Sequence, residues 1–245
     1  MRILVCMSVV PDTTSKITFK DNNSKFNTEG VQFIINPYDE LALTKALDIA
    51  EKNSGTVTII NVGLADSEPS IRKALAIGAN DAIRVNTEPK DALFVATQIA
   101  QVAIQHNYDI ILTGRESIDY NGGLVCGLLG ALLKIPSINV VTKFELDNGN
   151  ILATRDIDGG SEDLECSLPC VASAQKDLCE PRIPNMRGIM AARTKPLVVV
   201  EAVLENDFAE YISYELPVSK TGVKMISAEN AGELIDLLRN EKKLI

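Results

Sequence analysis

Residues 109–127, DIILTGRESIDYNGGLVCG, begin with a short apolar run and continue through a polar loop to two adjacent glycines. The run at 109–113 has the length and the isoleucine content of a buried strand. Gly122 and Gly123 lie where a helix is expected to start. Backbone amides and the dipole at a helix N-terminus can bind a phosphate, but a plain helix cap with glycines for tight packing predicts the same residues. The stretch therefore predicts strand, loop and helix, with phosphate binding as one of two interpretations.

Similar apolar runs occur upstream, and helical patterns separate them. The runs are RILVCM (2–7), TVTIINV (56–62) and DAIRV (81–85). Between them, apolar residues recur at helical spacing around 41–50 and 94–104. Strands that alternate with helices of this length need crossover connections, which produce a parallel sheet. We therefore expect an α/β fold with an open, mostly parallel, Rossmann-like sheet.

Two segments depart from this alternation. Residues 16–35 are expected to form a small hairpin that turns at Asp21-Asn22-Asn23. Residues 139–158 contain two alternating runs joined at 147–150, which predicts an antiparallel hairpin added to the sheet. Residues 156–165 hold an acidic cluster, for which a solvated turn is preferred over a metal site.

The remaining sequence completes the domain plan. SLPCVASAQ (167–175) is predicted to be one more sheet strand, and a final helix is predicted near 228–241. We expect a nucleotide-binding α/β domain over 1–199 and a C-terminal arm over 200–245. For the arm, contact with another subunit and a small appended lobe are equally good alternatives.

The composition argues against several classes of protein. The chain has 245 residues, 46% of them hydrophobic, and a net charge of -9, so general nucleic-acid binding is disfavoured. No apolar run approaches the roughly 18 residues of a membrane span, and the apolar run after Arg2 is too short for a signal peptide. We therefore expect a cytoplasmic, bacterial protein. With only one histidine, His106, and no C-x-x-C pair, the five cysteines are expected to be buried, reduced thiols.

Ligands of open parallel sheets bind beyond the carboxyl ends of the strands. There, Asn36 is expected to cap a helix that starts with Pro37, and Gly63 to allow close backbone approach. The loop at 114–127 matches neither the Walker A nor the dinucleotide fingerprint. The pattern favours a nucleotide-binding domain without catalytic or metal-binding residues, which is typical of a carrier or a subunit.

A second unusual stretch is EPRIPNMRGIMAARTK (180–195). It contains four basic residues and one acidic residue in a chain that is acidic overall, and Met186 and Met190 lie between the cations. A structural loop and a docking surface are both compatible with this pattern.

Six stretches, taken together and in this order, resemble the β subunit of electron transfer flavoprotein over nearly the whole chain. They are VVPDTTSKITF (9–19), INPYDELALTKAL (35–47), SIRKALAIGANDAIRV (70–85), LTGRESIDYNGG (112–123), RDIDGGSEDLECSLPCV (155–171) and EPRIPNMRGIMAARTKP (180–196). The resemblance implies a heterodimer with an α subunit that carries most of the FAD contacts, and a β subunit that buries AMP. Electrons would pass from acyl-CoA dehydrogenases, as in fatty acid β-oxidation, to a membrane quinone oxidoreductase. The chain would be a carrier subunit and not an enzyme.

The resemblance also assigns residues to nucleotide sites. The residues implied to line the adenine and ribose of AMP are Cys6, Asn36 and Val62. Those implied to hold its phosphate through backbone amides, close to Asp119, are Gly122, Gly123, Leu124 and Val125. Tyr38 and Thr13 would approach FAD, although relatives often carry tyrosine where this chain has Thr13.

Two further sites follow from the resemblance. Glu162 resembles a glutamate that pairs with an arginine of the α subunit. The dehydrogenase-docking residues are Met186, at the position of an apolar anchor, with Arg187, Ile189 and Met190. The neighbouring arginines would steer the chain toward acidic surfaces.

Three alternatives remain. Electron-bifurcating relatives bind a second FAD in place of AMP and typically carry a DGDTAQVG-like loop where this chain has DYNGGLVCG (119–127), which favours AMP. A stand-alone ATP- or AMP-binding regulator or hydrolase would be expected to have a Ser-Gly-Gly loop after the first strand, but SVVPDTT (8–14) has no glycine. A purely structural partner with a vestigial nucleotide pocket is the third.

Overall fold

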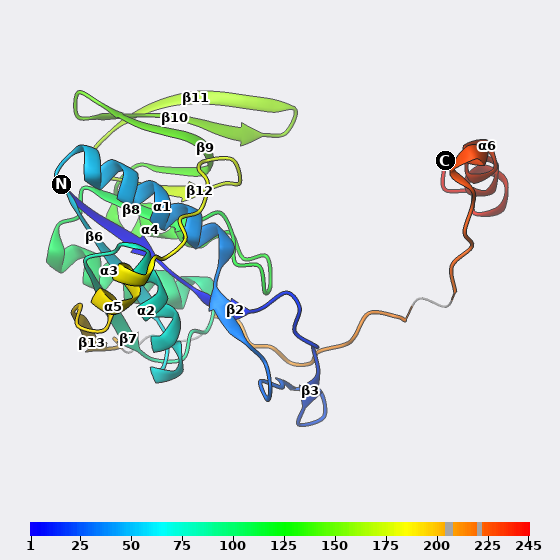
Figure 1. The fold of residues 1–245 in the computed structure, drawn as a ribbon, viewed down its shortest axis with the longest axis horizontal. Helices are drawn as coiled ribbons and strands as arrows, with labels where there is room; N and C mark the ends of the chain where they lie inside the picture. Colours follow the sequence, from blue (N-terminus) through cyan, green and yellow to red (C-terminus); the bar gives the residue numbers. More distant parts are fainter. Residues whose placement is uncertain (204–207, 220–221) are drawn as a thin grey trace. The chain divides into compact units, whose positions relative to one another are not determined.

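The computed structural model describes residues 1–203, 208–219 and 222–245 (Figure 1). The chain divides into two units. The first comprises 1–18 and 27–212, and the second comprises 19–26 and 213–245.

A nine-stranded sheet in the described residues forms the centre of the first unit. Its strands follow the spatial order β11 (Gly160–Ser167), β10 (Asn150–Ile157), β9 (Ser137–Asp147), β12 (Cys170–Ala174), β8 (Ile110–Gly114), β1 (Arg2–Cys6), β6 (Thr56–Val62), β7 (Asp81–Asn86) and β13 (Leu197–Glu201). The seven strands that follow β9 in this spatial order, counting β9 itself, run parallel to one another. β10 and β11 are antiparallel additions at the edge next to β9. The expected α/β fold and its added hairpin are confirmed.

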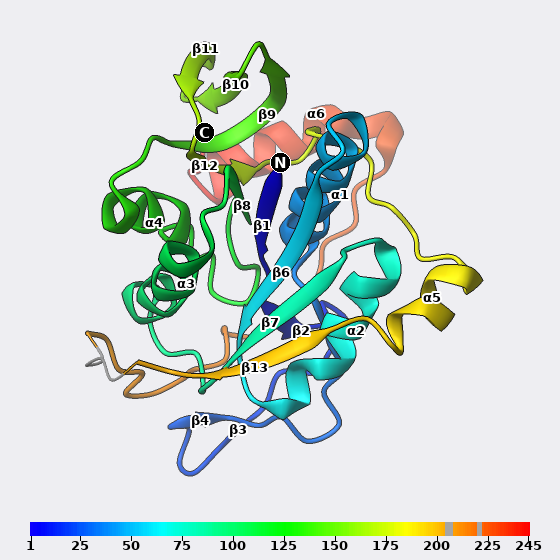
Figure 2. The ribbon, with the colours of Figure 1, turned by 90° about the vertical axis from the view of Figure 1, so that its left-hand side faces the viewer.

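Helices cover both faces of this sheet (Figure 2). On one face lie α1 (Pro37–Lys52), α2 (Glu68–Ile77) and α5 (Met186–Ala192), and on the other lie α3 (Ala92–His106) and α4 (Val125–Leu133). Alternate residues of β1 therefore enter two separate apolar cores: Ile3 and Val5 the first, Leu4 and Cys6 the second. Burial on both faces explains why the central parallel strands are mostly apolar.

The order of the central strands creates a switch point. From β1 the chain crosses through α1 to β6 on one side, whereas from β8 it crosses through α4 toward β9 and β12 on the other. The loops that leave the carboxyl ends of β1 and β8 therefore diverge, and such a crevice is the usual ligand site of an open α/β sheet.

The hairpin expected at 16–35 is only partly correct. Asp21, Asn22 and Asn23 have positive φ angles of 54°, 56° and 64°, which confirms the turn, and it joins β3 (Phe19–Lys20) to β4 (Lys25–Phe26). However, β5 (Phe33–Ile35) pairs with β2 (Val9–Pro11) instead of with residues near 16. This pairing buries Ile35 in the core, which a surface hairpin would not.

The segment 156–170 corrects two further expectations. The acidic cluster is not a single turn, because Asp156 ends β10 and Glu162, Asp163 and Glu165 lie along β11. The strand expected at 167–175 is shorter, since Ser167 ends β11 and β12 covers Cys170–Ala174. Leu168 and Pro169 lie between the two strands, because a proline cannot donate a ladder hydrogen bond. The described residues contain no group of three or more His, Cys, Asp or Glu side chains that could hold a metal.

The second unit is small. Phe19 stacks on Tyr214 with ring centroids 5.0 Å apart, and the Tyr214 amide donates to the Asn23 carbonyl at 2.8 Å. The predicted final helix is confirmed as three consecutive helical segments, the 3-10 turn η2 (Ala228–Asn230), α6 (Ala231–Asp236) and the π-helical η3 (Leu237–Glu241). These segments bury none of their side chains. Across the described ranges, no helix is both long enough and apolar enough to span a membrane.

Candidate functional site

Asp39 lies at the switch point and joins three segments. It is the third residue of α1, and its side chain is only 5% exposed. One carboxylate oxygen accepts hydrogen bonds from the amide and the hydroxyl of Ser8, at 2.8 and 2.7 Å, just beyond β1. The other accepts from the amide of Gly114, at 2.8 Å, where β8 ends. The carboxylate therefore fixes the start of both diverging loops.

The environment of Asp39 opposes its ionisation. Burial raises the pKa of this carboxyl group to about 6, although the hydrogen bonds from Ser8, Asn36 and Gly114 act in the opposite direction. Its electrostatic neighbour Cys6 is also affected, since burial and then the nearby Asp39 raise the pKa of the Cys6 thiol well above its usual value. Cys6 is therefore a neutral thiol beside this carboxyl group.

Asn36 connects α1 to the loop after β8. It is the N-cap residue of α1, as expected, and its carbonyl accepts from the amides of Asp39 and Glu40 at 2.9 and 3.1 Å, but its side chain makes no capping hydrogen bond. Instead its amide group donates to the carbonyl of Glu116 at 2.8 Å and accepts from the amide of Ile118 at 3.3 Å. Pro37 occupies the first turn of the helix, as predicted. The side chain, which is 1% exposed, orders the loop that carries the glycines.

The glycine-bearing part of the loop has little room for side chains. The Ser117 amide donates to the Gly122 carbonyl at 3.1 Å, and a Cβ on Gly122 would lie 2.1 Å from Cε2 of Tyr120. At Gly123 a Cβ would lie 3.2 Å from the carbonyl oxygen of Arg115. The glycines therefore let the loop fold back on itself before the helix. Asp119 is exposed and accepts hydrogen bonds from the Ser117 hydroxyl and the Tyr120 amide.

Helix α4 begins two residues after Gly123. Leu124 is its N-cap and contributes no side-chain hydrogen bond, and Val125 is its first helical residue. The first amides of a helix have no acceptor within the helix. Leu124 is 67% exposed, and these donors lie at the start of α4, after the loop that leaves β8. The donor set suits a phosphate group.

Cys6 and Val62 end the neighbouring strands β1 and β6, and both side chains belong to the core beneath α3 and α4. They are 6% and 7% exposed, and they are apolar or neutral, which suits the face of a purine ring. Tyr38 is half-buried beside Gly114, while Thr13 is exposed beyond β2. The structure thus brings Cys6, Asn36, Tyr38 and the glycine loop to one end of the sheet.

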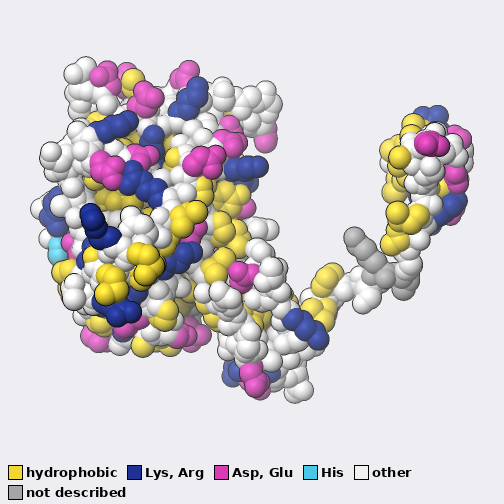
Figure 3. All heavy atoms as spheres, viewed as in Figure 1, with side chains coloured by type: hydrophobic (Ala, Val, Ile, Leu, Met, Phe, Trp, Pro, Cys, Tyr) yellow, Lys and Arg dark blue, Asp and Glu magenta, His cyan; other side chains and the backbone are white. Residues whose placement is uncertain are grey.

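The residues expected to dock on dehydrogenases form a separate surface on α5. Met186 is 74% exposed, Met190 57% and Ile189 41%, and Arg187 is exposed beside them. Figure 3 shows hydrophobic side chains over α5 with Lys and Arg side chains next to them. The Asn185 side chain caps this short helix by accepting from the Gly188 amide at 2.8 Å.

Two cations of the stretch 180–195 have structural partners. Arg182 donates to Asp48 at 2.5 Å and to Glu51 at 2.6 and 2.8 Å, which ties the segment to α1. The ammonium group of Lys195 donates to the carbonyls of Leu75 and Ala79, at 2.9 and 2.6 Å, at the end of α2. Arg187 and Arg193 are exposed, and no ion pair within the described ranges involves either of them.

Glu162 lies far from both surfaces, on the outer strand β11. It is paired in register with Arg155 on β10 and accepts a hydrogen bond from the Arg155 guanidinium. The glutamate thus has a partner within its own hairpin, and an arginine of another chain would have to share it or replace Arg155.

Asp39, Ser8 and Gly114 were not identified from the sequence. An acidic residue in the first turn of a helix is common, so the motif NPYDE gives no sign that the carboxylate is buried. A signal does exist in Gly114, which follows a strand directly: a Cβ there would lie 2.3 Å from the Asp39 carboxylate.

Comparison with known proteins agrees with the resemblance found in the sequence. A family model of the electron transfer flavoprotein domain matches residues 24–205. The electron transfer flavoprotein subunit beta of Bacillus subtilis is 36% identical, with full coverage of both chains. That of Syntrophomonas wolfei is 33% identical over all of this chain and 98% of its own length, and that of Dictyostelium discoideum is 31% identical over 96% and 97%. The fold, the motifs and these matches place the chain in the electron transfer flavoprotein family, among its β subunits.

Proposed function

We propose that this chain is the β subunit of a heterodimeric electron carrier in the bacterial cytoplasm, which shares one FAD with an α subunit. The carrier accepts electrons from acyl-CoA and related dehydrogenases and passes them to a membrane quinone oxidoreductase. The observation that carries the proposal is the match to β subunits along the full length of the chain. FAD would supply the redox chemistry, and the residues of this chain would hold, orient and shield the nucleotides.

The switch point is proposed to hold AMP. The fit rests on two observations: the uncapped amides at the start of α4, and the apolar ends of β1 and β6 nearby. The proposed AMP residues are Cys6, Asn36, Val62, Asp119, Gly122, Gly123, Leu124 and Val125. Because the Asn36 side chain is already bonded to the loop after β8, we expect it to shape the site, with at most one further hydrogen bond to the ribose. Tyr38 and Thr13 are proposed to face FAD.

Residues 200–245 are proposed to form an arm on the α subunit. Its apolar residues support this proposal, since Val218 is 96% exposed and Met225 85% exposed. Glu162 is proposed to pair with an arginine of the α subunit. Such a pair would bias a mobile flavin domain between two orientations.

The surface on α5 is proposed to dock on dehydrogenases, with Met186 as the anchor and Arg187, Ile189 and Met190 around it. A thioether adapts to pockets of different shape, which suits a carrier that serves several enzymes. Exposed arginines would increase the association rate with acidic surfaces.

The test is to purify the chain together with its α subunit and to determine the flavin spectrum and the nucleotide content. We expect a yellow complex with one FAD and one AMP for each heterodimer. Two FAD for each heterodimer would indicate an electron-bifurcating carrier and not the simple carrier proposed. A colourless complex would contradict the proposal and favour a purely structural subunit, and ATP binding by the isolated chain would favour a stand-alone regulator.

A further inference from the structure

A cavity of about 370 Å³ lies between α2 and α5, next to the docking residues. Its apolar lining comes from both helices and from the segment that leads into α5, namely Pro69, Ala76, Pro184, Ile189 and Ala192. Ile189 belongs both to this cavity and to the exposed apolar surface of α5. The cavity is therefore continuous with the proposed docking surface.

The charge of this cavity is opposite to that of the chain. Arg72, Lys73 and Arg193 line it, and none of its described lining residues is acidic, in a protein whose net charge is -9. Arg193 is exposed and forms no ion pair within the part of the chain that the structure describes. The cavity thus combines an apolar floor with a cationic rim.

The walls are fixed by contacts that do not depend on a partner. Arg72 donates to the carbonyls of Ala192 and Lys195, at 2.9 and 2.8 Å, and so holds the end of α5 against α2. A Cβ on Gly188 would lie 2.2 Å from the carbonyl oxygen of Ala76, so the two helices touch through the glycine. The cavity is consequently preformed, which lowers the entropic cost of filling it.

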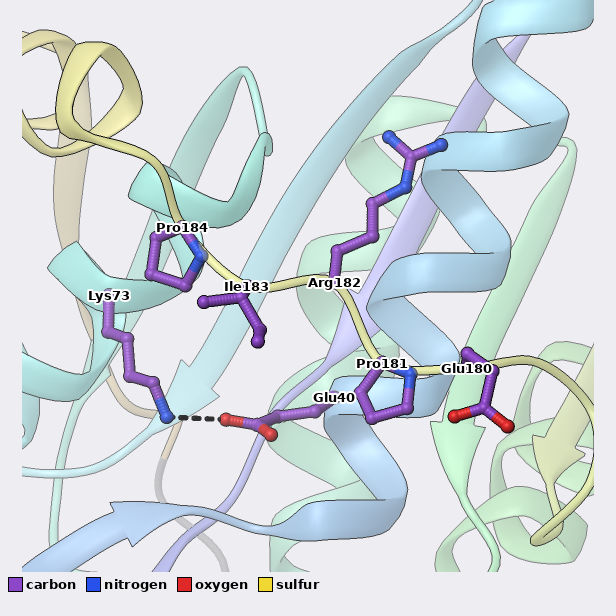
Figure 4. A pocket seen from close by; sticks show the side chains of 7 residues that line it. All are labelled: Glu40, Lys73, Glu180, Pro181, Arg182, Ile183 and Pro184. Carbon is purple, nitrogen blue, oxygen red and sulfur yellow. Dashed lines mark hydrogen bonds and ion pairs between the residues drawn. The ribbon is translucent and has the colours of Figure 1, made fainter.

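The neighbouring cavity is different. It has about 380 Å³, shares Lys73 and Pro184 with the first, and is lined by both signs of charge. Figure 4 shows Lys73 paired with Glu40, at 2.6 Å, and the Ile183 side chain pointing toward that pair. The two acids among its lining residues make it a poor site for an anion. Of these two cavities, the one between α2 and α5 has no acidic lining residue, and its Arg193 forms no ion pair with the described residues.

We propose that this cavity receives a side chain of the electron-donating dehydrogenase, namely an apolar residue with a carboxylate next to it in sequence. The apolar group fills the floor and the carboxylate pairs with Arg193. An inorganic anion would leave the apolar floor exposed to water, whereas an apolar side chain alone would leave Arg193 without an ion-pair partner. The inference rests on the proposed function and deepens it: docking is reciprocal, because each protein inserts an apolar residue into the other.

The first experiment compares Arg193→Glu with Arg187→Glu in the heterodimer, measured as the rate of flavin reduction by a dehydrogenase at low and high salt. Both substitutions change the net charge equally, so both should slow association at low salt. High salt screens such steering. At high salt we expect flavin reduction to remain about tenfold slower in Arg193→Glu alone, because this substitution removes the direct ion pair with the dehydrogenase carboxylate.

The outcomes separate the two proposals. If Arg193→Glu and Arg187→Glu behave alike at high salt while Met186→Ala still slows reduction, the cavity proposal is wrong and docking on α5 stands. If none of the three changes the rate, docking on α5 itself is wrong.

A second experiment identifies the occupant directly. Lys73 is exposed at the edge of the cavity, so Lys73→p-benzoylphenylalanine places a photo-crosslinker there. We expect a crosslink to a dehydrogenase peptide with an apolar residue within two positions of Asp or Glu, and none from the same label at Lys134, beyond α4. A crosslink to a second copy of this chain, to a peptide without a carboxylate, or to no dehydrogenase while electron transfer continues would overturn the proposal.

Discussion

At the scale of single residues, the fold depends on a carboxylate that the sequence places in an ordinary helix start. The Asp39 carboxylate is buried and accepts hydrogen bonds from Ser8 and Gly114. None of the described ion pairs includes it, so these hydrogen bonds, and not a cation, stabilise its charge. Burying such a charge is unfavourable and is tolerated where hydrogen bonds compensate it. The consequence is a proton equilibrium built into the centre of the proposed nucleotide site.

The first prediction concerns pH. Because the pKa of Asp39 is raised to about 6 from an ordinary 3.8, the native state binds this proton more tightly than the unfolded chain does. Its contribution to stability is present in full below about pH 4 and is lost as pH rises from about 4 to about 6, on the order of 2–3 kcal/mol. Asp39→Asn should remove this slope. Urea unfolding of both proteins at pH 4–8 measures it.

The opposite behaviour of another carboxyl group provides a check on the pH window. Hydrogen bonds from the amides of Phe94 and Phe208 lower the pKa of Asp91, so its contribution is lost only as pH falls below about 4. Equal slopes between pH 4 and 6 in the native protein and in Asp39→Asn would contradict the assignment.

The second prediction concerns Gly114. In Gly114→Ala the new Cβ would lie 2.3 Å from the Asp39 carboxylate and 3.0 Å from the Asp39 amide nitrogen, so the backbone itself has to move. We expect the free energy of unfolding to fall by about 1–3 kcal/mol. Gly160→Ala is the matched control, since nothing lies within 4 Å of a Cβ there. If both substitutions lower the free energy of unfolding by the same amount, the close contact between the end of β8 and the start of α1 does not exclude a side chain at residue 114.

At the scale of elements, the residues of the stretch 180–195 differ in role: some fix α5 to the sheet unit, and others are exposed on it. Arg182 and Lys195 bind α1 and the end of α2, and between them the helix presents Met186 and Met190 to solvent. The cations at the two ends of the stretch thus fix the helix, and those within it are available to a partner.

The third prediction follows from this arrangement. Met186→Ala should lower the second-order rate constant for flavin reduction by dehydrogenases about tenfold, because an anchor residue at an interface typically contributes more than 1 kcal/mol. Flavin content and heterodimer assembly should not change, since the side chain is 74% exposed. Ile104→Ala on α3, which is 59% exposed, is the control. Unchanged rates with several dehydrogenases would refute the anchor.

The elements also show what a sequence can predict. TVTIINV forms β6 over the predicted residues 56–62, because a strand buried on both faces is rich in Val and Ile. By contrast, β11 was missed, since an edge strand exposed on one face can alternate acids with half-buried residues. Asn36 and Asp39 look like helix-start residues, and only the tertiary structure shows their bonds to Glu116, Ser8 and Gly114.

At the scale of the whole molecule, the two units differ in how much of their surface they bury. The sheet unit has two apolar cores, one beneath each helical layer. The helical segments of the second unit bury no side chain, and three of its apolar residues, Val218, Val223 and Met225, are at least 80% exposed. Apolar surface of this kind marks a site of interaction with another protein.

The last prediction separates these roles. Removing residues 213–245 leaves both cores complete, so the sheet unit should still unfold in one cooperative transition. Assembly with the α subunit should weaken by at least about a hundredfold, because an apolar interface is lost. Circular dichroism in urea checks the first expectation and analytical ultracentrifugation of the mixed subunits the second. As a control, Val218→Ser with Met225→Ser in the full chain should weaken assembly without shortening the protein. If the truncated chain binds the α subunit as tightly as the full chain does, the sheet unit alone forms the interface. If the truncated chain no longer folds, the second unit stabilises the first.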